Sequence, residues 1–195
     1  MDQPRRLVLA SGSAYRKALL ERLGLAFEVA VPQVDERPLA EESPADTALR
    51  LAVLKARSQQ KAYPDALIIG CDQVASCGER RYGKPGNHDN AVRQLRELSG
   101  KAADFHTAVT VLDSQKNEHQ SRVVLCRVIF RTLDERRIQA YLQKEKPYDC
   151  AGAAKSEGLG IALIERLETD DPTSLIGLPL IALTEMLERA GLPVL

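Results

Sequence analysis

Two short apolar runs, Leu7 to Ala10 and Ala66 to Gly70, restrict the fold more than any other feature of the chain. Such short continuous runs are typical of strands that are buried on both faces. The residues next to each run follow helical spacing, with Ala18, Leu19, Leu20 and Leu23 after the first and Ala48, Leu51, Ala52 and Lys55 before the second. Buried strands next to amphipathic helices indicate an α/β protein.

The remaining patterns extend this order of strands and helices. Further strands are expected over Phe27–Val31, Phe105–Leu112 and Arg122–Phe130, with a hairpin between Gly78 and Gly83. Helices are expected up to Gly24, from Ser43 onward, and over residues 87–98, 133–144 and 180–190. We predict a mixed twisted sheet flanked by helices, with a cleft between two lobes. No repeat or biased linker marks a boundary, so residues 1–195 are expected to form one domain.

Charge and composition narrow the class of ligand. Lys plus Arg equals Asp plus Glu at 27 each, so the field of the whole chain would not draw it to a nucleic acid polymer or an anionic membrane. A small ligand is the better expectation. The first apolar run is too short for a signal peptide, and no run approaches the roughly 20 apolar residues of a membrane helix. We expect a cytoplasmic protein.

The segment from Ser11 to Lys17 is a candidate phosphate-binding site. Ser11 and Ser13 lie in a turn of small residues before a predicted helix, and Arg16 and Lys17 lie in its first turn. Such a turn presents backbone N–H groups and the positive end of the helix dipole to an anion. Cations there oppose the dipole at a cost of about 0.3–1 kcal/mol, so their placement indicates an anionic ligand. The alternative is a capped helix with two solvated basic side chains.

Four charged residues could add chemistry to this site. Asp72 follows the second apolar run, where a carboxylate could bind a divalent metal or accept a proton from water. Glu36 offers a hard oxygen ligand, and Lys55 and Lys84 offer point charges for phosphate oxygens. The alternatives are a buried Asp bonded to backbone amides and three solvated surface charges.

The order of these segments resembles the Maf-like proteins, which are relatives of the inosine-triphosphate pyrophosphatase superfamily. Leu7 to Lys17 is similar to the family's opening A-S-x-S-P-R-R. The resemblance continues over Val34–Glu36, Leu54–Ala56, Gly70–Val74, Gly83–Pro85, Leu98–Gly100, His106–Val109, Cys150–Gly152, Ser156–Gly158 and Gly177–Leu180. It thus covers nearly the whole chain.

This resemblance implies a Maf-type fold, like that of inosine-triphosphate pyrophosphatase, and hydrolysis between the α and β phosphates of a nucleoside triphosphate. It also implies a divalent metal, namely Mg²⁺, Mn²⁺ or Co²⁺. By the same matching, Asp72 is the catalytic acid–base and, with Glu36, a metal ligand. The triphosphate would be held by Arg16, Lys17, Lys55 and Lys84, together with Ser11 and Ser13. Members of this family are commonly homodimers, and the sequence alone does not decide the oligomeric state.

Three positions differ from the members that act on dTTP and UTP and are similar to the branch that prefers 7-methyl-GTP. Tyr15 offers an aromatic face for the positive charge of methylated guanine. Glu157 can accept hydrogen bonds from the guanine N1–H and N2–H₂ edge, and Gln73 can add a polar contact. The alternatives are a dTTP/UTP pyrophosphatase and a non-catalytic nucleotide-binding regulator of cell division. The complete set of charged residues favours an enzyme over a pure binder.

Overall fold

A computed structural model describes residues 5–195 of the chain. Its elements are β1 (Arg6–Ala10), α1 (Ala14–Glu21), β2 (Glu28–Val29), α2 (Pro44–Ser58), β3 (Ala66–Cys77), β4 (Arg80–Tyr82), α3 (His88–Leu98), β5 (Ala102–Asp113), β6 (Glu118–Phe130), α4 (Glu135–Glu145), the 3-10 helices η1 (Ala151–Ala153) and η2 (Leu159–Leu163), β7 (Ile164–Thr169) and α5 (Leu180–Arg189). The strands form a seven-stranded sheet in the order β2-β1-β3-β5-β6-β7, with β4 paired to β3. The predicted mixed sheet flanked by helices is therefore confirmed.

The chain divides into two compact units. Unit 1 contains the chain up to Gln73, Thr107–Val124 and Asp171–Leu195, and unit 2 contains Val74–His106 and Leu125–Asp170. Both units are built from segments that are far apart in the sequence, and strands β3, β5 and β6 contribute residues to both. Among residues 5–195, none of the helices has the length and apolar character needed to cross a membrane.

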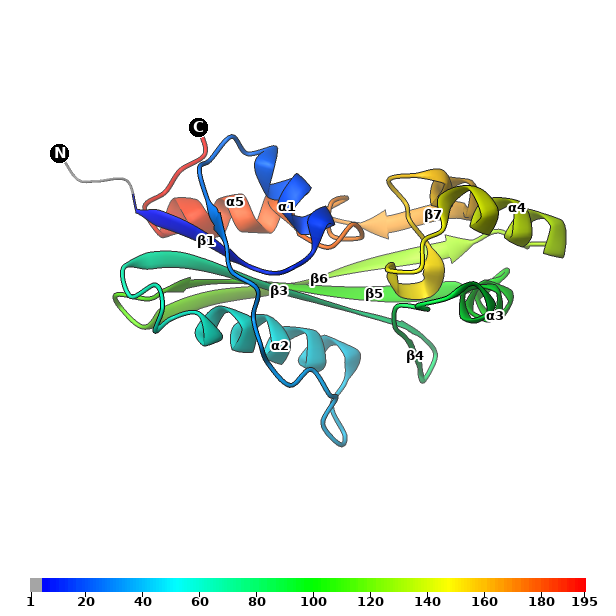
Figure 1. Cartoon of the computed structure of the whole chain (residues 1–195), viewed down its shortest axis with the longest axis horizontal. Coiled ribbons are helices and arrows are strands. Elements are labelled where there is room, and N and C mark those ends of the chain that lie inside the picture. The colour runs from blue at the N-terminus through cyan, green and yellow to red at the C-terminus, as the bar shows by residue number, and fades with distance from the viewer. Residues whose placement is uncertain (1–4) are drawn as a thin grey trace. The chain divides into compact units, whose positions relative to one another are not determined.

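In unit 1, β1 pairs in parallel with both β2 and β3. Figure 1 shows α1 and α5 on one side of these strands and α2 on the other. Alternate residues of β1 explain why its apolar run is continuous, because Leu7 and Leu9 pack in the core beneath α1 and α5 while Val8 and Ala10 pack in the core that includes Ala56 of α2. The sheet of unit 1 is thus buried on both faces, as the runs predicted.

Strand β3 is longer than its apolar run predicted. It continues from Gly70 through Asp72 to Cys77, so the apolar run predicted only the first part of the strand. Its last residues pair with β4 in the predicted hairpin, where Cys77 lies opposite Arg80. This pairing keeps a more polar segment extended. Asp72 therefore lies within a strand, where the backbone holds its side chain on one face of the sheet.

Unit 2 contains one strand that the sequence patterns missed. β7 pairs antiparallel with β6. Four of its six residues are exposed: the charged residues Glu165, Arg166 and Glu168, and the apolar residue Leu167. Such an edge strand has no apolar alternation to reveal it. The predicted helices of unit 2 are confirmed as α3, with Asn87 as its N-cap, and α4, with Asp134 as its N-cap.

Candidate functional site

The site begins where α2 packs closely against β3 in unit 1. A Cβ atom added to Gly70 would lie 2.0 Å from the carbonyl oxygen of Ala52 and 2.8 Å from the amide nitrogen of Ala56. Glycine at this strand position therefore allows the helix backbone to approach the sheet. This approach lets Lys55 of α2 reach the carboxylate of Asp72 on β3.

Lys55 and Asp72 form a buried ion pair. The Nζ atom of Lys55 lies 2.6 Å from Oδ1 of Asp72, and the two side chains are only 7% and 10% exposed. Burial raises the pKa of Asp72, while the charge and hydrogen bond of Lys55 and the charge of Arg16 oppose that rise. Within residues 5–195 only Oδ1 of this carboxylate accepts a hydrogen bond, so Oδ2 is available to another donor such as water.

Glu36 joins this pair from a segment without regular structure. Its Oε1 atom lies 2.9 Å from the same Lys55 ammonium, and its side chain is 57% exposed. The structure therefore brings three predicted residues, Glu36, Lys55 and Asp72, to one point. The neighbouring Asp35 instead accepts hydrogen bonds from Arg37, which lower its pKa.

A second group of predicted residues meets at the start of α1. Ser13 caps the helix and accepts a hydrogen bond from the amide of Arg16. Ser11 is buried, and its Oγ accepts from the amide of Ser13 at 3.2 Å and from Nη1 of Arg16 at 3.4 Å. The Nε of Arg16 donates to the carbonyl of Gly177 at 2.9 Å. Ser11 and this carbonyl fix the guanidinium of Arg16, while Ser13 holds its backbone amide.

Gln73 lies next to Asp72 on β3, so its side chain is on the opposite face of the strand. Its Nε2 donates to Thr107 Oγ1 at 2.9 Å and to the carbonyls of Ser174 and Leu175 at 3.0 and 3.1 Å. The N–H groups of its side-chain amide are thus already used in hydrogen bonds within the protein. Within residues 5–195 the Oε1 atom has no hydrogen-bond partner, so Gln73 can offer only an acceptor to a ligand.

The structure also places the other predicted residues. Lys17 is exposed on α1 and lies 3.6 Å from Glu21, whereas Tyr15 is half-buried on the same helix. Lys84 and Glu157 belong to unit 2. Lys84 is exposed in the loop between β4 and α3, and Glu157 is exposed in the turn before η2. The roles of these four residues stay predictions.

The two carboxylates fit a hard divalent cation. Glu36 and Asp72 each place a carboxylate oxygen within 2.9 Å of the same atom, the Nζ of Lys55. In the part of the chain that the structure describes, no group of three or more His, Cys, Asp or Glu side chains could hold a metal. Mg²⁺ commonly binds to one or two carboxylates and takes its other ligands from substrate phosphates and water. The pair fits a metal of that kind.

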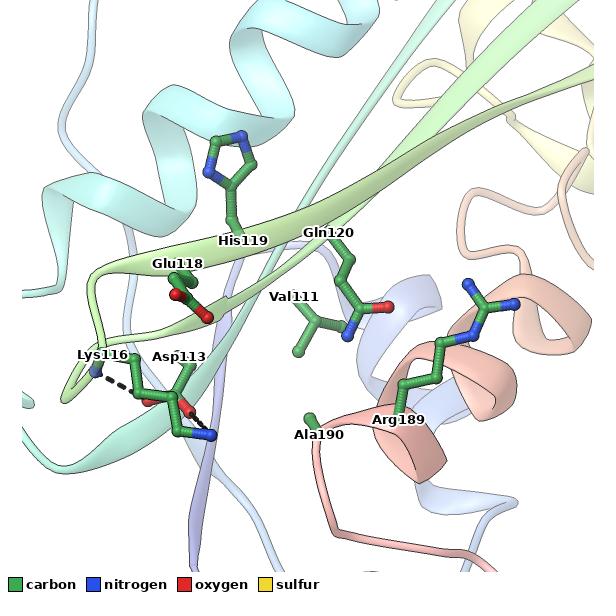
Figure 2. A pocket seen from close by; sticks show the side chains of 8 residues that line it. All are labelled: Val111, Asp113, Lys116, Glu118, His119, Gln120, Arg189 and Ala190. Carbon is green, nitrogen blue, oxygen red and sulfur yellow. Dashed lines mark hydrogen bonds and ion pairs between the residues drawn. The ribbon is translucent and has the colours of Figure 1, made fainter.

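Unit 1 also has a pocket that contains none of the predicted site residues (Figure 2). It is lined by residues of β5, β6, the turn between them and the end of α5, namely Val111, Asp113, Lys116, Glu118, His119, Gln120, Arg189 and Ala190. Three of its charged groups have partners nearby: Asp113 binds Arg5 at 2.6 Å and lies 3.9 Å from Lys116, and Arg189 lies 3.8 Å from Glu185. Because none of the predicted site residues lines this pocket, it is not part of the candidate site.

A mixed α/β fold that holds a buried Asp–Lys pair, a partly exposed carboxylate and a fixed arginine at a helix start is suited to binding a phosphorylated ligand. Residues 6–190 match the family model described as Maf-like protein. The chain therefore belongs to the Maf-like family, as its motifs predicted.

Curated relatives resemble the chain over almost its full length. A protein of Cupriavidus pinatubonensis named 7-methyl-GTP pyrophosphatase is 57% identical over 96% of this chain and 94% of its own. Proteins with the same name from Thiobacillus denitrificans and Methylobacillus flagellatus are 56% and 53% identical, each over 97% of this chain and over 94% and 98% of their own. The relatives bear the name of the activity that the sequence predicted.

Arg50 and Glu42, which hold the segment around Glu36, were missed by the sequence reasoning. The carboxylate of Glu42 accepts hydrogen bonds from Nε and Nη2 of Arg50 at 2.6 and 2.9 Å. Neither residue belongs to a quoted motif, and a spacing of eight positions across a helix start has no recognisable periodicity. No sequence signal could have identified this pair.

Proposed function

We propose that this protein hydrolyses 7-methyl-GTP between its α and β phosphates to give 7-methyl-GMP and diphosphate. The observation that carries the proposal is the meeting of Glu36, Lys55 and Asp72 at one point of unit 1. The names of the relatives support the reaction and its substrate. A pure nucleotide binder has no need of a buried carboxylate with an open oxygen, so this geometry favours an enzyme over a regulator without activity.

Cationic groups would bind the triphosphate. Ser11 and Gly177 orient the guanidinium of Arg16 through Nη1 and Nε, which leaves Nη2 to donate to a phosphate oxygen. The Lys55 ammonium can exchange its contact with Glu36 for a phosphate oxygen when the nucleotide arrives and keep its hydrogen bond to Asp72. We include Ser13, Lys17 and Lys84 in phosphate binding from their sequence motifs.

Asp72 would orient the attacking water and accept its proton. Lys55 holds Oδ1 at 2.6 Å, so Oδ2 is the oxygen that can accept the proton. Burial raises the pKa of Asp72, which makes it a stronger base than an ordinary aspartate. Water would attack the α phosphorus, the bond from that phosphorus to the oxygen bridging to the β phosphorus would break, and the diphosphate would leave with the bridging oxygen and its electron pair.

Glu36 and Asp72 are the residues that would hold the divalent metal, for which we propose Mg²⁺, Mn²⁺ or Co²⁺. Bound there, the metal would neutralise charge on the triphosphate and the departing diphosphate. Arg16 and Lys55 provide positive charge for the same purpose, since charge that develops on the leaving group is stabilised by cations that are already in place.

Three residues are proposed to select the base. Tyr15 would stack on the positively charged methylguanine. Glu157 would accept hydrogen bonds from the guanine edge, and Gln73 would add its free Oε1 as an acceptor.

We further propose, from the sequence, that residues 1–195 act as a single domain in the cytoplasm, and that the chain forms a homodimer.

A turnover assay tests this function. The protein is incubated with 7-methyl-GTP, GTP, UTP and dTTP in turn, with Mg²⁺, Mn²⁺ or Co²⁺, in heavy-oxygen water. Diphosphate should be released fastest from 7-methyl-GTP. Mass spectrometry should locate the heavy oxygen in 7-methyl-GMP, because water attacks the α phosphorus. Asp72→Asn should abolish turnover, whereas Glu185→Gln, a surface carboxylate control, should not. Preference for UTP or dTTP would contradict the substrate, and full activity of Asp72→Asn would contradict the mechanism.

A further inference from the structure

The residues between β2 and α2 form no helix or strand, yet they present Glu36 at a defined place. Residues 35–41 are all exposed, so little apolar packing holds them. Within residues 5–195, the one polar contact of the Glu36 side chain is its 2.9 Å ion pair with Lys55. A metal or a phosphate would compete for both partners of that ion pair. The segment therefore needs a contact that does not involve Lys55 if Glu36 is to be in place when the metal binds.

Arg50 of α2 supplies that contact through the backbone. Its Nη2 atom donates to the carbonyl of Arg37, the residue after Glu36, at 3.1 Å. The same guanidinium donates in a bidentate manner to Glu42, with Nε to Oε1 at 2.6 Å and Nη2 to Oε2 at 2.9 Å. Arg50 thus connects the rigid helix to both ends of the segment that follows Glu36.

Glu42 completes the connection. Its Oε2 atom also accepts from the amide of Leu39 at 3.1 Å and from Thr47 Oγ1 at 2.9 Å, and its side chain is 10% exposed. The hydrogen bonds from Arg50 are the main cause that lowers the pKa of Glu42 to about 2. Glu42 therefore stays ionised at neutral pH and keeps its bidentate pairing.

We propose that Arg50, acting with Glu42, is a positioning residue that sets the affinity of the site for its divalent cation by holding Glu36 beside Asp72. This inference rests on the proposed function, in which Glu36 is a metal ligand. Arg50 donates to Glu42 and to the carbonyl of Arg37, and so acts on Glu36 through the backbone. Groups that orient a metal ligand commonly change metal affinity or activity by about 10- to 100-fold when they are removed.

The variants Arg50→Lys and Glu42→Gln test the inference. Arg50→Lys keeps the charge and loses the bidentate fork, and Glu42→Gln keeps the shape and loses the charge. Arg57→Lys is the matched control, because Arg57 lies on the same helix and contacts Asn117 and His119 instead. Mn²⁺ binding is measured by electron paramagnetic resonance with an α,β-methylene nucleotide analogue, and turnover of 7-methyl-GTP is measured against Mn²⁺ concentration.

We expect the Mn²⁺ dissociation constant and the half-saturating Mn²⁺ concentration to rise by roughly tenfold in both variants, with kcat at saturating Mn²⁺ nearly unchanged. Arg57→Lys should match the wild type. Adding Arg50→Lys to Glu36→Gln should weaken Mn²⁺ binding little further, because the two changes remove one function. A merely structural role would instead lower kcat without changing the Mn²⁺ dependence, or give additive effects, and either result would overturn the proposal.

The two proposals can fail separately. If the wild type turns over no nucleotide but Arg50→Lys still weakens Mn²⁺ binding, the positioning role stands and the proposed function fails. If the wild type is active and both variants bind Mn²⁺ as tightly as Arg57→Lys, only the positioning role fails. If Arg50→Lys does not fold, as judged by thermal unfolding, Glu42→Gln alone decides the question.

Discussion

Replacing Gly70 by alanine should damage the fold and the site together. The added Cβ would lie 2.0 Å from the carbonyl oxygen of Ala52, 2.8 Å from the amide nitrogen of Ala56 and 2.9 Å from the Cβ of Ala56. Two of these atoms belong to the helix backbone and the third is attached directly to it. No flexible side chain can move aside, so α2 and β3 have to separate.

The geometry sets the size of the effect. Non-bonded atoms pack best at about 3.5 Å, so the helix must retreat by roughly 1 Å or more near Ala52. Overpacking of this kind costs about 1–3 kcal/mol, and the rigid contact places Gly70→Ala at or above the upper end. The 2.6 Å contact between Lys55 and Asp72 would lengthen with the same movement. A misplacement of about 1 Å can reduce turnover by roughly 100-fold.

Urea unfolding and steady-state turnover of 7-methyl-GTP would measure the two effects. Gly83→Ala is the control for stability, because nothing lies within 4 Å of its added Cβ, and it should change the free energy of unfolding by less than about 1 kcal/mol. If Gly70→Ala unfolds at the wild-type urea concentration and keeps wild-type turnover, then close packing of α2 on β3 does not position Lys55.

Three further outcomes are expected. Burial raises the pKa of Asp72, so its carboxyl group binds a proton more tightly in the folded protein than in the unfolded chain. The protonated carboxyl group therefore contributes to stability at low pH, and this contribution is lost as the pH rises through the folded-state pKa. The free energy of unfolding of the wild type should therefore fall more steeply with pH than that of Asp72→Asn, and parallel curves from urea titrations would contradict this. Asp171 is buried and its Oδ2 accepts from the amides of Ile181 and Ala182, so Asp171→Ala should cost about 2 kcal/mol in urea unfolding by uncapping α5. Arg16→Ala should raise KM for the nucleotide more than Lys17→Ala does, by about tenfold or more, because Arg16 is fixed by Ser11 and Gly177 whereas Lys17 is 55% exposed; equal KM values would show that the fixed guanidinium does not bind phosphate.

Local patterns were sufficient for most of the secondary structure. The apolar runs predicted β1 and the buried part of β3, and Ser43 with Pro44 predicted the start of α2. Errors occurred where pairing, and not side-chain pattern, decides the conformation. β2 has only two residues, Glu28 and Val29, although a longer strand was expected, and the exposed edge strand β7 was missed.

The candidate site divides in the same way. Motifs identified Lys55, Asp72 and Glu36 as charged residues of one site, and the structure places a carboxylate oxygen of Glu36 and one of Asp72 within 2.9 Å of the Nζ atom of Lys55. The motifs did not reveal that Gln73 uses its amide nitrogen to bind Thr107, Ser174 and Leu175. Nor did they reveal that Arg16 binds the carbonyl of Gly177, a residue 161 positions later.

Local sequence patterns were enough to predict which segments are buried, where helices begin, which residues carry charge and which family the motifs resemble. These properties depend on periodicity and on residue type over a few neighbouring positions. Only the tertiary structure decided that Gly70 lets α2 approach β3, that Lys55 lies between two carboxylates, and that Arg50 and Glu42 hold the segment around Glu36. These contacts join residues through packing, which depends on the whole chain and leaves no local pattern.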